Sequence, residues 1–216
     1  MAEIIDLTYN INEDMITYPT PWHPKVEIER LGKIEEVGRN TRKIIIGTHT
    51  GTHIDAPLHF IENGNSIEKI PLTKLIGEVT IVDFSSMKCN HSISKEDISQ
   101  IPFSKKILFK FGWEGKWNNM EFYENHPYFS KEAANLLVSK GVELIGYDTP
   151  SPDSSLKNNN EIDSPIHKIF LKNDIILLEY VANRSKIDDF NNWTIVVAPM
   201  KIEGSDGSPS RVFIYK

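Results

Sequence analysis

The chain has 216 residues, of which 39% are hydrophobic and 25% charged, and its formal net charge is −6 at pH 7. This length allows one large domain or two small ones. Because the sequence shows no repeat, low-complexity tract or clear linker, we expect a single domain over residues 1–216. The negative charge, with no Lys/Arg cluster among aromatic residues, argues against a nucleic-acid partner.

Targeting and redox signals predict the compartment. The first residues lack the basic and then apolar pattern of a signal peptide. No apolar run approaches the roughly 20 residues needed to cross a bilayer. A single cysteine, Cys89, excludes an internal disulfide and is typical of a reducing compartment. We therefore expect a cytoplasmic protein with no membrane partner.

Strands dominate the predicted secondary structure. Eight segments rich in Ile and Val, bounded by turn-forming residues, have the composition of strands. In chain order they are residues 25–31, 42–48, 78–84, 106–112, 142–148, 174–181, 194–199 and 211–215.

Two helices are predicted between strands. Residues 130–141 have Ser130 as the N-cap and Gly141 as the stop. Residues 164–174 have Ser164 as the N-cap and a proline at the first helical position. The polar run at residues 157–161 is expected to be a loop. A single α/β domain with a mixed β-sheet core and few helices is therefore predicted.

Residues 49–60, HTGTHIDAPLHF, place three histidines and one aspartate in twelve positions. Gly51 and Pro57 argue against a helix. In a straight strand His49 and His53 would stand roughly 13 Å apart, too far for one ion with bonds of about 2 Å. We expect a strand that runs into a tight turn at Gly51 and folds the imidazoles inward. One such histidine alone would usually be a surface or capping residue, but the cluster predicts a divalent metal site.

This stretch resembles the H-x-G-T-H-x-D-x-P-x-H-F signature of the cyclase family of metal-dependent hydrolases, which includes bacterial kynurenine formamidases and isatin hydrolases. Four further segments resemble family motifs in the same order. They are the opening segment at residues 4–19, a D-T-x-S-x-D turn at 146–153, a second metal-binding stretch at 164–183 and a closing D-G-S-P segment at 198–211. The resemblance spans nearly the whole chain and implies a swivelling β/β/α-like fold.

The resemblance also implies roles for individual residues. His59 matches the histidine that serves as catalytic acid/base, and Tyr18 falls where the family has an aromatic residue lining the substrate pocket. The implied metal ligands are His49, His53, Asp55, His167 and Glu179. These ligands suffice for one open site or for two ions about 3.5–4 Å apart.

Glu179 points to a cation independently of the resemblance. It lies in an otherwise apolar predicted strand, and burying an unpaired carboxylate is costly. The alternative is an edge position where Glu179 is exposed to water. His167, by contrast, would by itself more often be a structural histidine. Imidazole and carboxylate ligands without a thiolate favour zinc first and manganese second.

The implied reaction is hydrolysis of the C–N bond of a small amide by metal-activated water, with His59 passing a proton to the departing nitrogen. The first candidate substrate is an aryl formamide such as N-formylkynurenine; a cyclic amide of the isatin type or another small amide is the alternative. Formamidases usually carry Trp-Pro-Gly-Asp where this chain has Tyr18-Pro-Thr-Pro, and residues 111–130 resemble members of broader substrate range. Aromatic residues that could line the pocket are Trp22, Trp113, Trp117, Tyr123 and Tyr128.

A non-catalytic metal protein that binds a small molecule is the alternative from another class. A structural zinc site prefers four Cys or His ligands, whereas this set is rich in carboxylates and lacks cysteine, which favours an open catalytic site.

The N-terminal third also predicts assembly. Its apolar-alternating strands have few helices to cover them, and an uncovered sheet face is an association surface. The resemblance implies a dimer or tetramer, so we expect a homodimer or homotetramer. If the aromatic segment around Tyr18 and Trp22 crosses to the neighbouring subunit, each pocket would be partly built by its partner.

Overall fold

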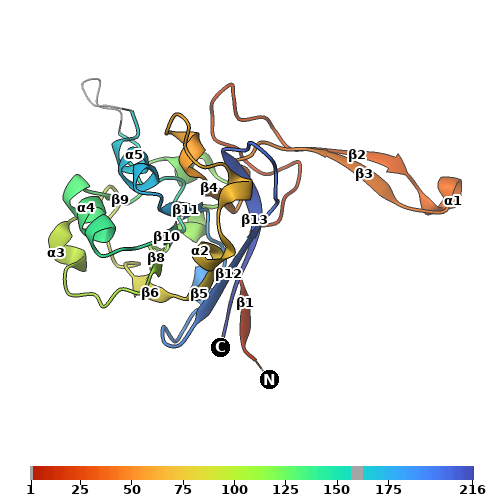
Figure 1. Ribbon diagram of the computed structural model, residues 1–216. Helices are drawn as coiled ribbons and strands as arrows, with labels where there is room; N and C mark the ends of the chain where they lie inside the picture. Colours follow the sequence, from red (N-terminus) through yellow and green to blue (C-terminus); the bar gives the residue numbers. More distant parts are fainter. Residues whose placement is uncertain (1, 157–162) are drawn as a thin grey trace.

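The computed structural model describes residues 2–156 and 163–216. The run at residues 157–161, expected to be a loop, lies outside them. A nine-stranded mixed sheet forms the centre of the molecule (Figure 1). Its order is β5 (Ile76–Glu78), β12 (Thr194–Pro199), β13 (Gly207–Tyr215), β4 (His53–Asp55), β11 (Ile176–Glu179), β10 (Leu144–Tyr147), β8 (Lys106–Lys110) and β6 (Thr80–Asp83), and β1 (Ile4–Asp6) pairs with β13.

The sheet has a parallel and an antiparallel part that meet at β11. Strands β6, β8, β10 and β11 run parallel, whereas β4 is antiparallel to both β11 and β13. All eight predicted strands are present, and the predicted α/β class with a mixed sheet is confirmed. Strand β4, which contains two of the predicted ligands, was not predicted, because three residues are too few to show a strand pattern.

Helix α4 (Lys131–Ser139) confirms the predicted caps. The Ser130 hydroxyl accepts the Ala133 N–H at 3.1 Å, and Gly141 has a positive φ of 73°. Helix α5 (Pro165–Lys172) begins where expected, but the Ser164 side chain makes no capping hydrogen bond. Instead, the Asp153 carboxylate accepts the N–H groups of Ile166 and His167 at 2.7 and 3.1 Å. Ser164 therefore stands at the predicted N-cap position, but the capping hydrogen bonds come from Asp153, a residue distant in sequence.

The remaining elements are short. They are α1 (Ile34–Val37), α2 (Leu72–Leu75), α3 (Lys95–Ile98), the parallel pair β7 (Ser92–Ile93) and β9 (Tyr128–Phe129), and five 3₁₀ turns among the described residues. No helix in this part of the chain combines the length and hydropathy that a membrane crossing requires.

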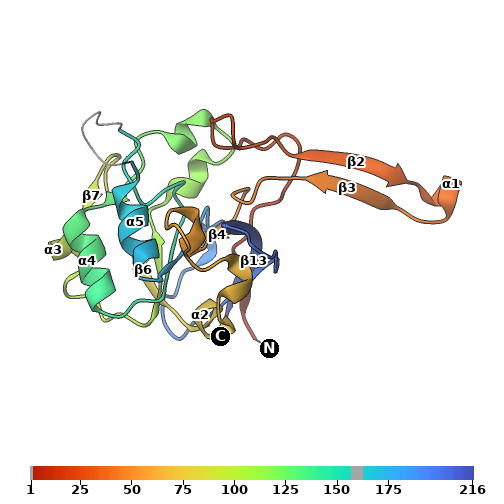
Figure 2. The ribbon, with the colours of Figure 1, turned by 45° about the horizontal axis from the view of Figure 1, so that its top comes forward.

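Hydrophobic side chains pack on both faces of the parallel strands. Ile107 and Phe109 of β8 join one core cluster, together with Leu137 and Phe170 from α4 and α5, while Leu108 joins the other. Helices α4 and α5 lie side by side on the first face (Figure 2). Burial on both faces explains why these strands read as continuous apolar runs. A carboxylate at the end of such a strand therefore lies within the protein interior.

Strands β2 (Glu27–Gly32) and β3 (Thr41–Ile45) form a separate antiparallel hairpin closed by α1. Both ribbon views show this hairpin projecting from the rest of the molecule (Figures 1 and 2). The side chains of β3 are exposed along its whole length. The predicted uncovered strands of the N-terminal third are therefore present, as an arm rather than as an edge of the main sheet.

Candidate active site

The register between β4 and β11 places three predicted ligands together. His53 lies directly opposite Glu179 in the antiparallel pair, and Asp55 lies two residues along the same face of β4. All three side chains are buried. Because β4 is flanked by β11 and β13, these groups lie in the interior of the sheet. The alternative that Glu179 occupies a water-exposed edge is wrong.

A turn brings His49 back to the same place. Gly51 has a φ of 60°, a conformation that favours glycine, as predicted for this turn. His49 Nδ1 lies 2.7 Å from Asp55 Oδ1. Its ring lies so close to the β13 backbone that a Cβ added to Gly207 would be 2.6 Å from His49 Cε1. Two glycines therefore allow the His49 ring to reach Asp55.

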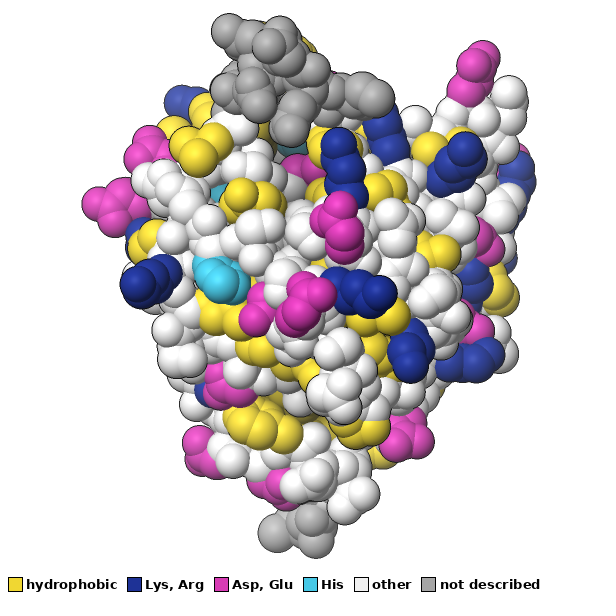
Figure 3. All heavy atoms as spheres, turned by 90° about the vertical axis from the view of Figure 1, so that its left-hand side faces the viewer, with side chains coloured by type: hydrophobic (Ala, Val, Ile, Leu, Met, Phe, Trp, Pro, Cys, Tyr) yellow, Lys and Arg dark blue, Asp and Glu magenta, His cyan; other side chains and the backbone are white. Residues whose placement is uncertain are grey.

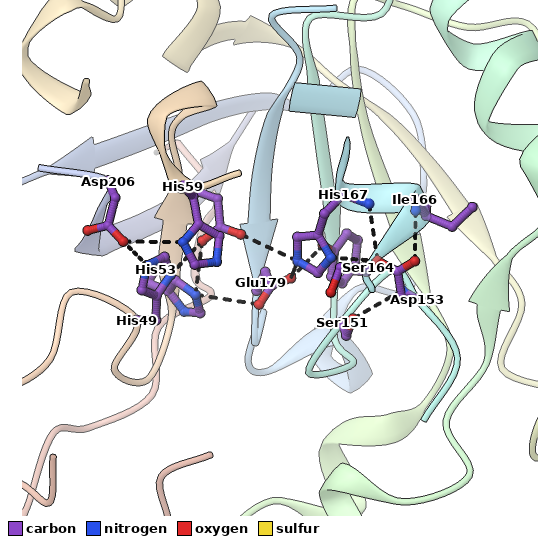
Figure 4. A network of polar contacts seen from close by, with 12 residues as sticks. His49, His53, His59, Ser151, Asp153, Ser164, Ile166, His167, Glu179 and Asp206 are labelled. Atoms are coloured by element: carbon purple, nitrogen blue, oxygen red, sulfur yellow. Dashed lines mark hydrogen bonds and ion pairs between the residues drawn. The ribbon is translucent and has the colours of Figure 1, made fainter. Parts of the chain in front are cut away.

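His167 enters the site from α5. Its Nδ1 is 2.6 Å from Asp153 Oδ2, and its Nε2 is 3.3 Å from Glu179 Oε1 and 3.6 Å from Asp55 Oδ2. Figure 4 shows Glu179 between His167 on one side and His49, His53 and His59 on the other. Since a carboxylate can only accept, His167 Nδ1–H donates to Asp153, and Nε2 is directed toward the other ligands.

Two buried polar atoms without hydrogen-bond partners indicate which kind of ligand this cluster can bind. His53 Nδ1–H donates to the carbonyl oxygen of Gly51 at 2.8 Å, so its Nε2 carries a lone pair. That Nε2 and Asp55 Oδ2 are buried without a hydrogen-bond partner in the described structure. His53 Nε2 lies 3.4 Å from both Asp55 Oδ1 and Glu179 Oε2. Lone pairs and carboxylates that converge in a buried space fit a divalent cation.

A second group of possible ligands shares Asp55. It comprises His49, Asp55 and His59, whereas the first comprises His53, Asp55 and Glu179. Asp206 joins the second group, with its Oδ2 at 2.9 Å from His49 Nε2 and 3.2 Å from His59 Nδ1. A carboxylate shared between two groups is compatible with one open site or with two neighbouring ions.

The site favours positive charge. Burial lowers the pKa of His49, but the carboxylates of Asp55 and Asp206 outweigh it and raise that pKa to about 10. Burial also lowers the pKa of His167, but the hydrogen bond to Asp153 and the nearby Glu179 outweigh it and raise that pKa to about 10. Hydrogen bonds from His49 and His59 hold the pKa of Asp206 far below its usual range. The excess of carboxylates would bind a metal cation in the same way.

Aromatic residues line the approach to the site. The Tyr18 ring lies 5.3 Å from that of Tyr123, and a hollow of about 650 Å³ is lined by residues 13–21, His23, Lys25 and Met120. A smaller hollow of about 250 Å³ contains Trp22, His23, Gly47, Thr48, His49, His59 and Asp206. Tyr18 and Trp22 therefore line two neighbouring hollows, which both include His23.

The other aromatic candidates separate into pocket and core. Trp117 stacks on Tyr9, with ring centroids 4.0 Å apart. Trp113 is buried in the core and donates its indole N–H to the Phe122 carbonyl at 2.9 Å, so its expected place in the pocket is wrong. Tyr180, which was not predicted, lies 5.2 Å from His53 between ring centroids. Its φ of 57° is unusual for a bulky residue and is typical of functional sites.

Comparison with known proteins identifies the family. The Cyclase family model matches residues 5–154, more than half of the chain. The chain belongs to the cyclase family. A kynurenine formamidase from Bacillus thuringiensis subsp. konkukian (strain 97-27) is 31% identical to this cyclase-family chain over 218 residues, covering 99% of the chain and 97% of the relative.

Solved structures agree with the fold. A structure described as a potential metal-dependent hydrolase with cyclase activity superimposes on this cyclase-family chain with a TM-score of 0.80 at 28% identity, covering 100% of the chain and 98% of that structure. An isatin hydrolase bound to the product analogue thioisatinate has a TM-score of 0.88 at 20% identity and covers 100% of the chain and 92% of its own. The isatin hydrolase shares the fold.

Asp153 and Asp206 are the residues that the sequence left without a role. Each lies in a segment that resembles a family motif, the D-T-x-S-x-D turn and the D-G-S-P segment, and this was the only signal. The structure places each carboxylate against a histidine of the cluster. Such partners orient a histidine and fix which ring nitrogen faces the site.

We expect Asp153→Asn to weaken metal binding about 10–100-fold, because the amide holds the His167 ring less firmly than the carboxylate. Competition with a chromophoric chelator measures this affinity. Ser164→Ala is the matched control, since Ser164 lies beside the same helix end without capping it. Asp153→Asn with the affinity of the unaltered chain would show that Asp153 serves the helix end alone.

Proposed function

We propose that this cyclase-family chain is a metal-dependent amidohydrolase that cleaves the C–N bond of a small aromatic amide, with an aryl formamide such as N-formylkynurenine as the first candidate. One observation carries the proposal. His53 Nε2 and Asp55 Oδ2 are buried without hydrogen-bond partners in the described structure, and they lie in the same cluster as His59, whose side chain is 24% exposed. The full-length similarity to a kynurenine formamidase supports the choice of substrate.

The proposed ligands are His49, His53, Asp55, His167 and Glu179. We propose zinc as the first choice of metal and manganese as the second, because the donors are imidazole and carboxylate without thiolate. When bound, one or two divalent ions would supply a nucleophilic water at neutral pH and polarise the scissile carbonyl. Tyr147 donates its hydroxyl to Glu179 Oε1 at 2.7 Å, which holds this carboxylate in the cluster.

His59 is the proposed acid/base. Its Nδ1–H donates to Asp206, which leaves Nε2 to hold a proton and pass it to the departing nitrogen. Imidazole suits this task because its unperturbed pKa is about 6.5. Asp206 orients the ring and stabilises its protonated form, as a carboxylate does in a catalytic triad.

The proposed binding site for the substrate ring is formed by aromatic residues. Tyr18 stands edge-on to Tyr123, and Tyr180 lies between Tyr123 and His53. Such rings offer edge-to-face contacts to an aryl group. The hollow lined by Tyr18, of about 650 Å³, can admit a substituted ring.

Parallel assays of N-formylkynurenine, a formyl anilide and isatin with the zinc-loaded protein test the proposal. We expect release of formate from the two formamides and slower opening of isatin. Faster hydrolysis of isatin would identify cyclic amides as the substrate class. Two observations support that alternative: the fold shared with an isatin hydrolase, and Tyr18-Pro-Thr-Pro in place of the Trp-Pro-Gly-Asp of formamidases. Binding of these compounds without any turnover would contradict the enzyme and favour a binding protein.

We further propose that the protein acts in the cytoplasm and forms a homodimer or homotetramer. Cys89 is exposed and unpaired, which suits a reducing compartment. The projecting hairpin supports association.

A further inference from the structure

The two hollows of the site have one residue in common, His23. The larger hollow is lined by Tyr18, and the smaller one is lined by His49 and His59 of the buried cluster. The centroid of the His23 ring lies 5.6 Å from that of Tyr18 and 6.0 Å from that of His49. His23 therefore stands where the aromatic part of the site joins the part with the proposed ligands.

The backbone holds the His23 ring in place. Its N–H donates to the carbonyl oxygen of Thr20 at 3.1 Å, which closes a tight turn. Pro21 and Pro24 lie on either side of this histidine, and each proline has a fixed φ. Pro24 also packs on Gly47, where an added Cβ would lie 3.1 Å from Pro24 Cδ. Such a preorganised residue can bind a ligand without the cost of ordering a flexible segment.

The side chain of His23 is partly buried and has unused hydrogen-bonding capacity. Its ring nitrogens have no hydrogen-bond partner among residues 2–156 and 163–216, whereas those of His49 and His59 contact Asp206. An imidazole has at least one N–H in either protonation state. His23 therefore presents a free donor to a molecule that occupies the hollows.

The charges around the larger hollow indicate which kind of acceptor this donor meets. Glu13 and Asp14 line this hollow together with one cation, Lys25. The two carboxylates repel an anionic group of a bound molecule, whereas they do not repel a neutral carbonyl oxygen. A neutral carbonyl is therefore the acceptor that suits the N–H of His23.

We propose that His23 determines substrate specificity by donating a hydrogen bond to a carbonyl group that the substrate carries on its ring, next to the amide nitrogen. A substrate whose ring lies beside Tyr18 and whose amide reaches the cluster passes His23 with the ring position next to the amide. N-formylkynurenine and isatin both carry a carbonyl at this position. The assigned substrate class, aryl amides with an acyl group beside the amide, rests on the proposed function.

Two formanilides of the same shape test this contact. One carries an acetyl group on the ring next to the formamide nitrogen, and the other carries an isopropenyl group, in which a CH₂ replaces the carbonyl oxygen. The ratio of their kcat/KM values measures the preference for the oxygen. An effect of a substitution on the catalytic step is common to both compounds and cancels in this ratio.

Three variants of His23 separate its N–H from its shape. His23→Phe keeps a ring but has no donor, whereas His23→Asn and His23→Gln place an amide N–H near the positions of Nδ1 and Nε2. Circular dichroism checks that each variant is folded.

His91→Phe is the matched control. His91 lies beside Asp97 of α3, and α3 lies on the side of the molecule opposite to the projecting hairpin (Figure 1). On that side, charges of both signs are interspersed with small apolar areas (Figure 3). Because both hollows include residues just before this hairpin, a substitution beside α3 should not change the ratio.

We expect the zinc-loaded unaltered chain and His91→Phe to prefer the acetyl compound. In His23→Phe the ratio should fall about 3–10-fold, which is the contribution of one neutral hydrogen bond. His23→Asn or His23→Gln should retain part of the preference. An unchanged ratio in His23→Phe would overturn the proposal. An equal loss in all three variants would overturn it too, because the ring and not its N–H would then be responsible.

Calorimetric binding of the two product amines separates this proposal from the proposed function. 2′-Aminoacetophenone retains the carbonyl, and 2-isopropenylaniline lacks it. We expect the first to bind more tightly to the unaltered chain, and this difference should also fall about 3–10-fold in His23→Phe. Equal affinities of the two amines for the unaltered chain would overturn the contact with His23. Lack of turnover by every sample would reject the proposed function, while the affinities would still decide whether His23 binds the carbonyl.

Discussion

Replacing His53 or Asp55 by alanine is expected to remove most of the bound metal and to abolish hydrolysis. His53 contributes the bare Nε2 at the centre of the buried cluster, and Asp55 is the carboxylate shared by both groups of possible ligands. Asp55→Ala should have the larger effect, because it takes a ligand from each group and leaves His49 and His53 without their common partner. Elemental analysis of the purified variants, together with turnover after reloading with zinc, gives both quantities.

Two further variants serve as controls for this result. His91→Ala removes a histidine that lies outside the cluster, beside Asp97, and should retain metal and activity. Asp55→Asn keeps the size of the buried side chain while removing its charge, which separates loss of a ligand from loss of packing. Full metal content in both His53→Ala and Asp55→Ala would contradict their assignment as ligands.

His59→Ala is expected to behave differently: it should retain its metal and lose about 10²–10⁴-fold in kcat. The side chains of the predicted ligands are at most 10% exposed, whereas that of His59 is 24% exposed and hydrogen-bonded to Asp206. Loss of the imidazole removes the group that passes a proton to the leaving nitrogen. Its pH–rate profile should also lose the limb that reports this group.

The Asp206→Asn variant extends this prediction. The amide still holds the His59 ring but lacks the charge of the carboxylate, so kcat should fall, though less than in His59→Ala. Metal content and kcat are measured on the same samples. Turnover by His59→Ala at the rate of the unaltered chain would reject the acid/base role, and loss of its metal would indicate a ligand instead.

Local sequence determined much of this protein. The Ile- and Val-rich runs predicted the strands because a strand buried on both faces must be apolar throughout. Ser130 and Gly141 predicted the ends of α4, since capping depends on neighbouring residues alone. The tight turn at Gly51 was predicted from the need to fold the imidazoles inward, and the structure has a φ of 60° there. The composition of residues 49–60 predicted metal chemistry in the same local way.

Tertiary structure decided the rest, because the deciding contacts join distant segments. Ser164 looked like the cap of α5, but Asp153 fills that role and holds His167 as well. Asp206 reaches His49 and His59 only because β13 pairs with β4, with Gly207 opposite Asp55. Pairing register is a non-local property, and a slip of one residue would turn these side chains to the other face of the sheet. The sequence alone therefore predicted which residue types would bind a metal, and only the register of the folded sheet determined which carboxylates would orient them.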